Sequence, residues 1–167
     1  PSSNRARLGD IFTLAQGVWG ALNCRAGAIA HGPEDLADDL SSFFPRFIQN
    51  YYDVVVTWYE TVKLGATGGE VVDAVAARQD RSLYQLAVNP GHAIHLDEWV
   101  HSSFVEGDPI PLYSGMALQM DIIPVSAGPF CYANAEDGII LADKALRLDI
   151  ESSHPQTWRR IQKRRDF

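Results

Sequence analysis

The sequence predicts an α+β domain built on a mainly antiparallel β-sheet. Large apolar side chains recur at helical spacing over residues 44–64, which is the strongest periodic signal in the chain. Before and after that region, short apolar segments are separated by turn-forming Gly, Pro, Asn and Asp residues, as is typical of antiparallel strands.

The N-terminal third is expected to form a pair of strands and then a long helix. Residues 11–30 predict two strands joined by a turn near residues 17–20. The helix is expected to begin near Leu36 or Phe44 and to end at Leu64. Pro45 would then lie near a first turn or mark a kink.

A second helix is expected to begin at Thr67 and to end near Arg78, because Thr67 and Glu70 match the capping-box pattern. The apolar segments 83–88, 117–125 and 138–141 then predict strands. The chain is expected to end in a helix with Trp158 and Ile161 facing inward. Its basic residues would face outward on a solvated surface.

Composition limits the class of protein. The 167 residues, of 18.5 kDa, fit one domain spanning residues 1–167, and 46% hydrophobic with 21% charged residues indicates a globular chain. A net charge of −7 argues against nucleic acid as a partner. No apolar run approaches the length of about 18 residues that a membrane span needs. Cys24 and Cys131 form no disulfide framework, so a reducing, cytoplasmic location is expected.

Three side chains capable of binding a metal lie in or beside apolar segments: His92, Asp121 and Glu136. A carboxylate in an apolar strand is costly unless it is paired or metal-bound. One imidazole with two carboxylates suits Mn, Co or Zn. A hydrogen-bonded structural role fits the same residues, so their chemistry leaves both interpretations open.

The segments around these residues carry a family resemblance. Gly91-His92-Ala93-Ile94 resembles a Gly-His-x-Ile-Gly motif, and the strand from Leu112-Tyr113-Ser114-Gly115-Met116 to Asp121 and Pro124 resembles a Leu-x-x-Gly-Met strand. Ala135-Glu136-Asp137 resembles a late Ile-Glu-Asp strand. Near the N-terminus, Leu8-Gly9-Asp10 resembles a Pro-Gly-Asp segment, and between the two expected helices Leu64-Gly65-Ala66-Thr67 resembles a Pro-Gly-x-Thr turn. In this order, the segments resemble those of the creatinase, aminopeptidase P and prolidase family of pita-bread metallopeptidases.

The resemblance implies the pita-bread fold, with a curved, mainly antiparallel sheet and helices on one face. It also implies a dinuclear metal site with two Asp, one His and two Glu ligands, and hydrolysis at a peptide N-terminus, often with Pro in second position. The family domain has helices and a strand before its Pro-Gly-Asp segment, so we expect the N-terminal part of that domain to be missing here.

The sequence departs from the family at the first two ligands. Ala15 stands at the position of the family's first Asp ligand. The position of the second Asp ligand is expected near Asn23 and Cys24, just before Arg25. Alanine cannot ligate a metal, Asn is a poor replacement for a bridging carboxylate, and a thiolate does not suit a hard site. No acidic residue lies within residues 11–32, so no shift of the alignment restores these ligands.

The remaining positions are altered too. Asp121 stands where the family has Glu, which shortens its reach by about 1.5 Å. His95 replaces a Gly, and Trp99 stands at the position of a second family His, two residues before His101. The expected ligands are therefore His92, Asp121 and Glu136, and the expected cofactor is none, or one weakly bound Mn, Co or Zn ion.

Three functions follow from the resemblance. The first is a domain that binds a peptide or protein N-terminus with little or no hydrolysis, using aromatic and imidazole groups of the cleft: His95, Trp99, His101, Tyr113 and Phe130. The second is an active metallopeptidase with a reduced site. The third is a metal-free, creatinase-like hydrolase with His92, His95 or His101 as acid/base. A second copy of the chain is also a candidate partner.

Overall fold

The computed structural model describes residues 3–18, 21–94, 100–125 and 135–165. The elements are β1 (Ile11–Val18), β2 (Ala21–Ala28), the short 3-10 helix η1 (Pro33–Asp35), α1 (Asp38–Thr61), α2 (Gly68–Arg78), β3 (Gln85–Leu86), β4 (Gly91–Ala93), β5 (Ala117–Ile122), β6 (Pro124–Val125), β7 (Ala135–Ile140), α3 (Lys144–Ser153) and α4 (Pro155–Arg165).

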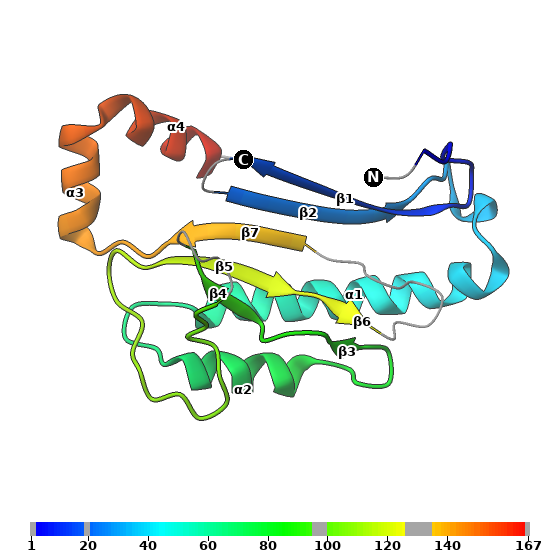
Figure 1. The fold of residues 1–167 in the computed structure, drawn as a ribbon, viewed down its shortest axis with the longest axis horizontal. Helices are drawn as coiled ribbons and strands as arrows, with labels where there is room; N and C mark the ends of the chain where they lie inside the picture. Colours follow the sequence, from blue (N-terminus) through cyan, green and yellow to red (C-terminus); the bar gives the residue numbers. More distant parts are fainter. Residues whose placement is uncertain (1–2, 19–20, 95–99, 126–134, 166–167) are drawn as a thin grey trace.

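The main sheet has five strands in the order β1-β2-β7-β5-β4, and every neighbouring pair is antiparallel. A second, two-stranded sheet pairs β3 with β6. The α+β class and the mainly antiparallel sheet expected from the sequence are therefore confirmed. Figure 1 shows the sheet running along the long axis of the molecule, with α1 passing behind β5 and β6.

The helix α1 packs on the sheet through one stripe of side chains. Its buried residues recur at intervals of three and four: Phe47, Tyr51, Val54 and Trp58. The facing side chains of β5 are also buried: Leu118, Met120 and Ile122. The Tyr51 hydroxyl donates a 2.8 Å hydrogen bond to the Ile122 carbonyl and ties the helix to the strand. This core fixes the face on which β5 presents its other side chains.

The expected boundaries match for α2, whereas α1 begins at Asp38 and ends at Thr61, three residues before the expected Leu64, and the strand boundaries shift. The capping box of α2 is present, with Glu70 N–H donating to Thr67 Oγ1 and Thr67 N–H to the Glu70 carboxylate. Pro45 lies inside α1 rather than at its first turn. Of the expected strand 83–88 only β3 pairs, 117–125 divides into β5 and β6, and β7 begins three residues before position 138.

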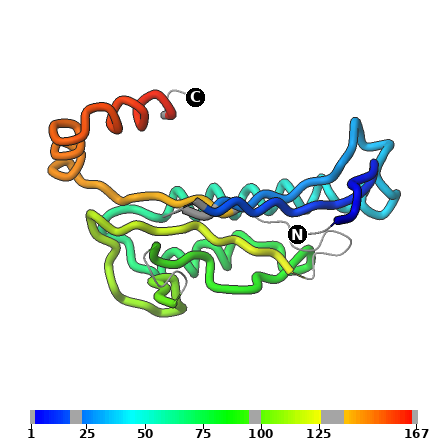
Figure 2. Tube along the Cα trace, turned by 45° about the horizontal axis from the view of Figure 1, so that its top comes forward, coloured from blue at the N-terminus to red at the C-terminus, as the bar shows by residue number. Residues whose placement is uncertain are grey.

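The C-terminal region differs most from expectation, because it holds two helices instead of one. Asp143 caps α3 by accepting a hydrogen bond from Leu146 N–H, and α4 follows directly after His154. The two helices pack on each other and project from one end of the molecule (Figure 2). No helix among the described residues combines the length and apolar character that crossing a bilayer requires.

Candidate functional site

The two faces of the main sheet differ in chemistry because side chains alternate along each strand. In β5, Leu118, Met120 and Ile122 face α1, so Gln119 and Asp121 lie on the opposite face. We call that second face the polar face. Its site residues are Ala15, Cys24, His92, Gln119, Asp121 and Glu136.

The strand register places four of these positions in one line. Ala15 is the partner of Cys24 across β1 and β2, Cys24 of Glu136 across β2 and β7, and Glu136 of Asp121 across β7 and β5. Directly paired residues project to the same face. Ala15 therefore shares a face with the two carboxylates, which agrees with its assignment to the position of the first Asp. Asn23 and Cys24 were the two candidates for the position of the second Asp. Because Cys24 is the direct partner of Glu136, Cys24 occupies that position on the polar face.

His92 joins this line from β4, next to the end occupied by Asp121. It pairs with Gln119 of β5, and its side chain is buried. His92 Nδ1 lies 3.0 Å from the Ala93 carbonyl oxygen, which can only accept, so Nδ1 carries the proton. In the neutral ring Nε2 is then the nitrogen without a proton, and it lies 3.8 Å from Asp121 Oδ2, too far for a hydrogen bond.

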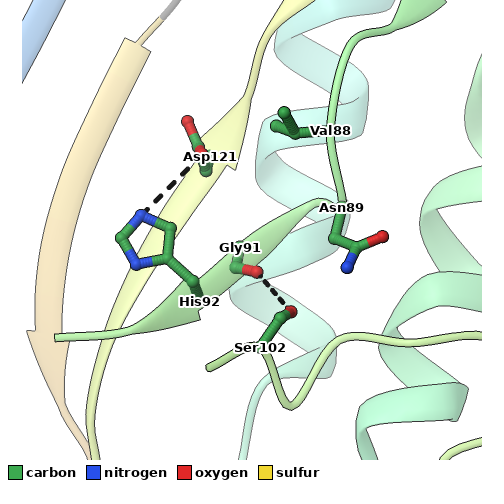
Figure 3. A pocket seen from close by; sticks show the side chains of 6 residues that line it. All are labelled: Val88, Asn89, Gly91, His92, Ser102 and Asp121. Atoms are coloured by element: carbon green, nitrogen blue, oxygen red, sulfur yellow. Dashed lines mark hydrogen bonds and ion pairs between the residues drawn. The ribbon is translucent and has the colours of Figure 1, made fainter. Parts of the chain in front are cut away.

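A hollow of about 320 Å³ opens beside this pair. Figure 3 shows its lining residues, which are Val88, Asn89, Gly91, His92, Ser102 and Asp121. The Ser102 hydroxyl donates to the Gly91 carbonyl at 2.7 Å and accepts from Phe104 N–H at 3.0 Å, which fixes the wall opposite Asp121. The hollow therefore combines an apolar side with a buried imidazole and a buried carboxylate.

Sequence reasoning missed Gln119. Its amide nitrogen donates a 3.1 Å hydrogen bond to the Glu136 carboxylate, and both side chains are buried. Gln119 Oε1 is buried without a hydrogen-bond partner among the described residues. The available signal was the alternation of two polar residues, Gln119 and Asp121, with the apolar residues of β5.

The structure brings together the expected ligands His92, Asp121 and Glu136 on three neighbouring strands, β4, β5 and β7. His101 is exposed, and it is the backbone carbonyl of this residue that supports β4 by accepting from Ala93 N–H. Tyr113 is exposed as well, and neither residue lines the hollow. His95, Trp99 and Phe130 lie outside the described residues. Within the described ranges, no three His, Cys, Asp or Glu side chains form a group that could hold a metal ion.

An ion pair on the other face fixes the strands that carry Cys24 and Glu136. Arg25 donates two hydrogen bonds to the Asp137 carboxylate, at 2.7 and 2.9 Å, and contacts the Cys24 and Glu136 carbonyls. The bonds to Asp137 raise the pKa of Arg25, while partial burial works in the opposite direction. Burial raises the pKa of nearby Tyr59. This clamp holds β2 against β7 at the row of site residues.

Comparison with solved structures identifies the fold. The chain resembles an Xaa-Pro dipeptidase from Bacillus anthracis, with a TM-score of 0.63 and 21% identity over 84% of this chain and 39% of that one. A prolidase from Thermococcus sibiricus matches with a TM-score of 0.64 and 20% identity, over 86% of this chain and 38% of that one. A methionine aminopeptidase from Rickettsia prowazekii matches with a TM-score of 0.60 and 18% identity, over 85% and 64% of the two chains.

These matches confirm the resemblance to the pita-bread family and the expected fold class. The chain spans about two fifths of the length of the dipeptidase and the prolidase. No protein-family model and no curated protein matches the sequence. At these identities the likeness establishes the fold alone.

Proposed function

We propose that this chain binds the N-terminus of a peptide or protein on the polar face, with little or no hydrolysis. One observation carries the proposal. The line across four strands holds carboxylates at Asp121 and Glu136 only, whereas Ala15 and Cys24 occupy the two positions at which the family resemblance implies Asp.

The charge of this line does not fit a pair of divalent ions. Two such ions carry +4, and Asp121 with Glu136 supplies at most −2. The four family carboxylates would supply −4. In a partly buried site the uncompensated charge costs several kcal/mol, on the order given by Coulomb's law at an effective dielectric constant of about 20. We therefore derive no hydrolytic step through a dinuclear centre.

A peptide N-terminus fits the same groups. Its α-ammonium group carries +1 and donates three hydrogen bonds, and the two buried carboxylates are acceptors of opposite charge. The adjoining hollow of about 320 Å³ is large enough for one or two residues, with Val88 as an apolar contact and Asn89 as a polar one. Because two of the similar structures are named for Xaa-Pro or prolidase activity, a peptide with Pro in second position is the first probe.

A peptidase with one metal ion is the second candidate, and the geometry of His92 favours it. The Nε2 lone pair faces Asp121 Oδ2 across 3.8 Å. Two ordinary metal–ligand bonds of about 2.1 Å span up to about 4.2 Å, so one Zn, Mn or Co ion fits between these atoms. The hydrogen bond from Nδ1 to the Ala93 carbonyl holds the tautomer that such a ligand needs.

The test measures binding and cleavage in parallel. A fluorescent Ala-Pro peptide with a free amine is titrated against its N-acetylated form. We expect the free amine to bind at least about tenfold more tightly. Glu136→Gln should abolish that preference, whereas Glu60→Gln, the same chemical change at an exposed residue of α1, should leave it intact. Equal binding of the two peptides would contradict the proposal.

Cleavage assays separate the alternatives. We expect little or no cleavage with or without Mn, Co or Zn. Metal-dependent cleavage that disappears in His92→Ala would establish the one-metal peptidase. Metal-independent cleavage that disappears in the same variant would establish a His-based hydrolase. Calorimetric titration with each ion completes the test, and tight binding of two ions per chain would overturn the charge argument.

A further inference from the structure

The amide of Gln119 holds an oxygen at the polar face that no described residue satisfies. Gln119 is 1% exposed, and its Oε1 atom is buried without a hydrogen bond to a described residue. The other end of the amide fixes this orientation. A carboxylate only accepts, so the nitrogen faces Glu136 and the oxygen faces away from it. Because buried polar atoms almost always have a partner, this oxygen is a ready acceptor for a donor on a ligand.

The two residues paired with Gln119 in the sheet do not supply that donor. On β4 the partner is His92, whose Nδ1–H donates to the Ala93 carbonyl and whose Nε2 carries no proton in the neutral ring. On β7 the partner is Gly138, which has no side chain. The Ile94 side chain lies over this glycine, since a Cβ atom at Gly138 would be 2.8 Å from Ile94 Cδ1. The groups next to Gln119 are therefore an imidazole without a spare proton and an aliphatic chain.

The amide oxygen of Gln119 and the Glu136 carboxylate are close enough to bind the same donor group. The Gln119 nitrogen lies 3.1 Å from Glu136 Oε2, and the two heteroatoms of an amide are about 2.3 Å apart. Gln119 Oε1 therefore lies within about 5.4 Å of that carboxylate. Two charge-assisted N–H···O hydrogen bonds of about 2.8 Å reach acceptors up to about 5.6 Å apart. One ammonium group can thus contact both side chains.

We infer that Gln119 is a specificity-determining residue for the peptide N-terminus, because its amide oxygen accepts a third hydrogen bond from a primary α-ammonium group. The inference rests on the proposed function, in which Asp121 and Glu136 bind the same group. A primary ammonium has three N–H donors, and the three side chains each offer it an acceptor. The ligand class is therefore a peptide whose first residue has an unmodified primary amine.

A secondary ammonium group should be rejected by this arrangement. An N-methylated terminus and an N-terminal proline each carry two N–H donors instead of three. Either would leave the buried oxygen of Gln119 without a donor and without water. Sites that hydrogen-bond a ligand group discriminate strongly against an analogue that lacks it, because the buried partner is then unpaired.

The test compares three forms of one fluorescent Ala-Pro peptide: the primary amine, the N-methyl amine and the N-acetylated form. Near pH 7 the two amines are mostly protonated, so they match in charge and differ in one N–H donor. We expect the parent chain to bind the primary amine at least about tenfold more tightly than the N-methyl amine. Equal binding of the two amines, both tighter than the acetylated form, would overturn this inference and leave the proposed function standing. Equal binding of all three forms would overturn both.

The variant Gln119→Met assigns the discrimination to the amide. Methionine keeps a similar length and volume, so a preference caused only by steric exclusion of the methyl group would persist. We expect the ratio of the two amine affinities to fall to within about twofold of one. Gln85→Met makes the same change at an exposed residue of β3 and should keep the parent ratio. A parent-like ratio in Gln119→Met would overturn the inference.

Two further measurements complete the experiment. Circular dichroism establishes that Gln119→Met is folded, and the comparison of the two amines on the parent chain needs no variant and can refute the inference by itself. Calorimetric titration with Mn addresses the other donor-free ligand of an amide oxygen, a hard cation. We expect the parent and Gln119→Met to respond equally to Mn. Mn binding that Gln119→Met loses would assign the oxygen to a metal ion and overturn the inference.

Discussion

Gln119 and Glu136 lie on neighbouring strands of the polar face and are joined by a 3.1 Å hydrogen bond from the Gln119 amide nitrogen to a Glu136 carboxylate oxygen. Both side chains are buried, with 1% and 6% exposure. A buried carboxylate is costly unless donors compensate it. The Gln119 amide therefore offsets part of the cost of burying the Glu136 carboxylate, as a bound cation would.

The first prediction concerns this pair. Gln119→Leu removes the donor and leaves the carboxylate buried, so the free energy of unfolding should fall by about 1–3 kcal/mol. Urea unfolding at pH 7 measures the change. The control is Gln85→Leu, an exposed strand residue, which should stay within about 0.5 kcal/mol of the parent. Equal effects of the two changes would contradict the importance of the hydrogen bond.

The second prediction is a gain of metal binding. Ala15→Asp with Cys24→Asp places four carboxylates in the line across β1, β2, β7 and β5. Affinity for Mn or Co should rise at least about tenfold, and the ion should then raise the free energy of unfolding of the variant more than that of the parent.

A matched control for this gain exists on the adjacent residue pair. Gln16 and Asn23 are direct partners that project to the opposite face. Gln16→Asp with Asn23→Asp adds the same charge and should add no metal affinity. If both double variants bound the ion equally well, the assignment of Ala15 and Cys24 to ligand positions would be wrong.

Much of the architecture could be predicted because its signals are local. The stripe of α1 follows from the spacing of its apolar residues, and the start of α2 from Thr67 and Glu70. The grouping of His92, Asp121 and Glu136 followed from motif order. These features depend on a few residues close in sequence, so they do not require knowledge of the tertiary contacts.

The remaining features depend on register and packing. Whether Asn23 or Cys24 meets Glu136 is decided by the pairing of β1, β2 and β7, because a shift of one residue exchanges the two faces. Gln119 gains its role only when β5 lies between β4 and β7. The helix α3 was missed although Asp143 is a recognisable N-cap, and it contributes no buried residue to the core.

The third prediction concerns Gly91, which precedes His92 and lets β4 approach β5. A Cβ atom at this position would lie 2.5 Å from the Gln119 carbonyl oxygen and 2.8 Å from the Phe104 ring. Gly91→Ala should therefore push β4 away from β5 and lower the free energy of unfolding by about 2 kcal/mol or more. Peptide binding should weaken with it, because His92 moves.

The control for that change is Gly107→Ala. Both glycines have a positive φ, of 154° at Gly91 and 70° at Gly107. A Cβ atom at Gly107, however, would meet open space. Its substitution should cost only the conformational strain of about 1 kcal/mol and leave binding unchanged. A cost for Gly91→Ala no larger than that of Gly107→Ala would exclude steric crowding as the reason for glycine at position 91.

The last prediction is a dependence of stability on alkaline pH that involves Tyr84. This side chain is 1% exposed and packs edge-on against Phe47, with ring centroids 5.4 Å apart. Its hydroxyl has no hydrogen-bond partner among the described residues, and burial raises the pKa of Tyr84 above its usual value near 10.

Because of this raised pKa, Tyr84 ionises at a lower pH in the unfolded chain than in the folded chain. The contribution of this group to stability is complete below about pH 10 and is lost as the pH rises above it, by up to about 1.4 kcal/mol per pH unit. Tyr84→Phe should reduce that slope, and it should cost little at pH 7 because it removes a buried hydroxyl that bonds to none of the described residues. Tyr51→Phe is the comparison, since it breaks the bond to the Ile122 carbonyl and should cost about 1 kcal/mol at pH 7. Urea unfolding of the three proteins at pH 7 and near pH 11 measures both effects, and an unchanged alkaline slope in Tyr84→Phe would show that the buried phenol does not control it.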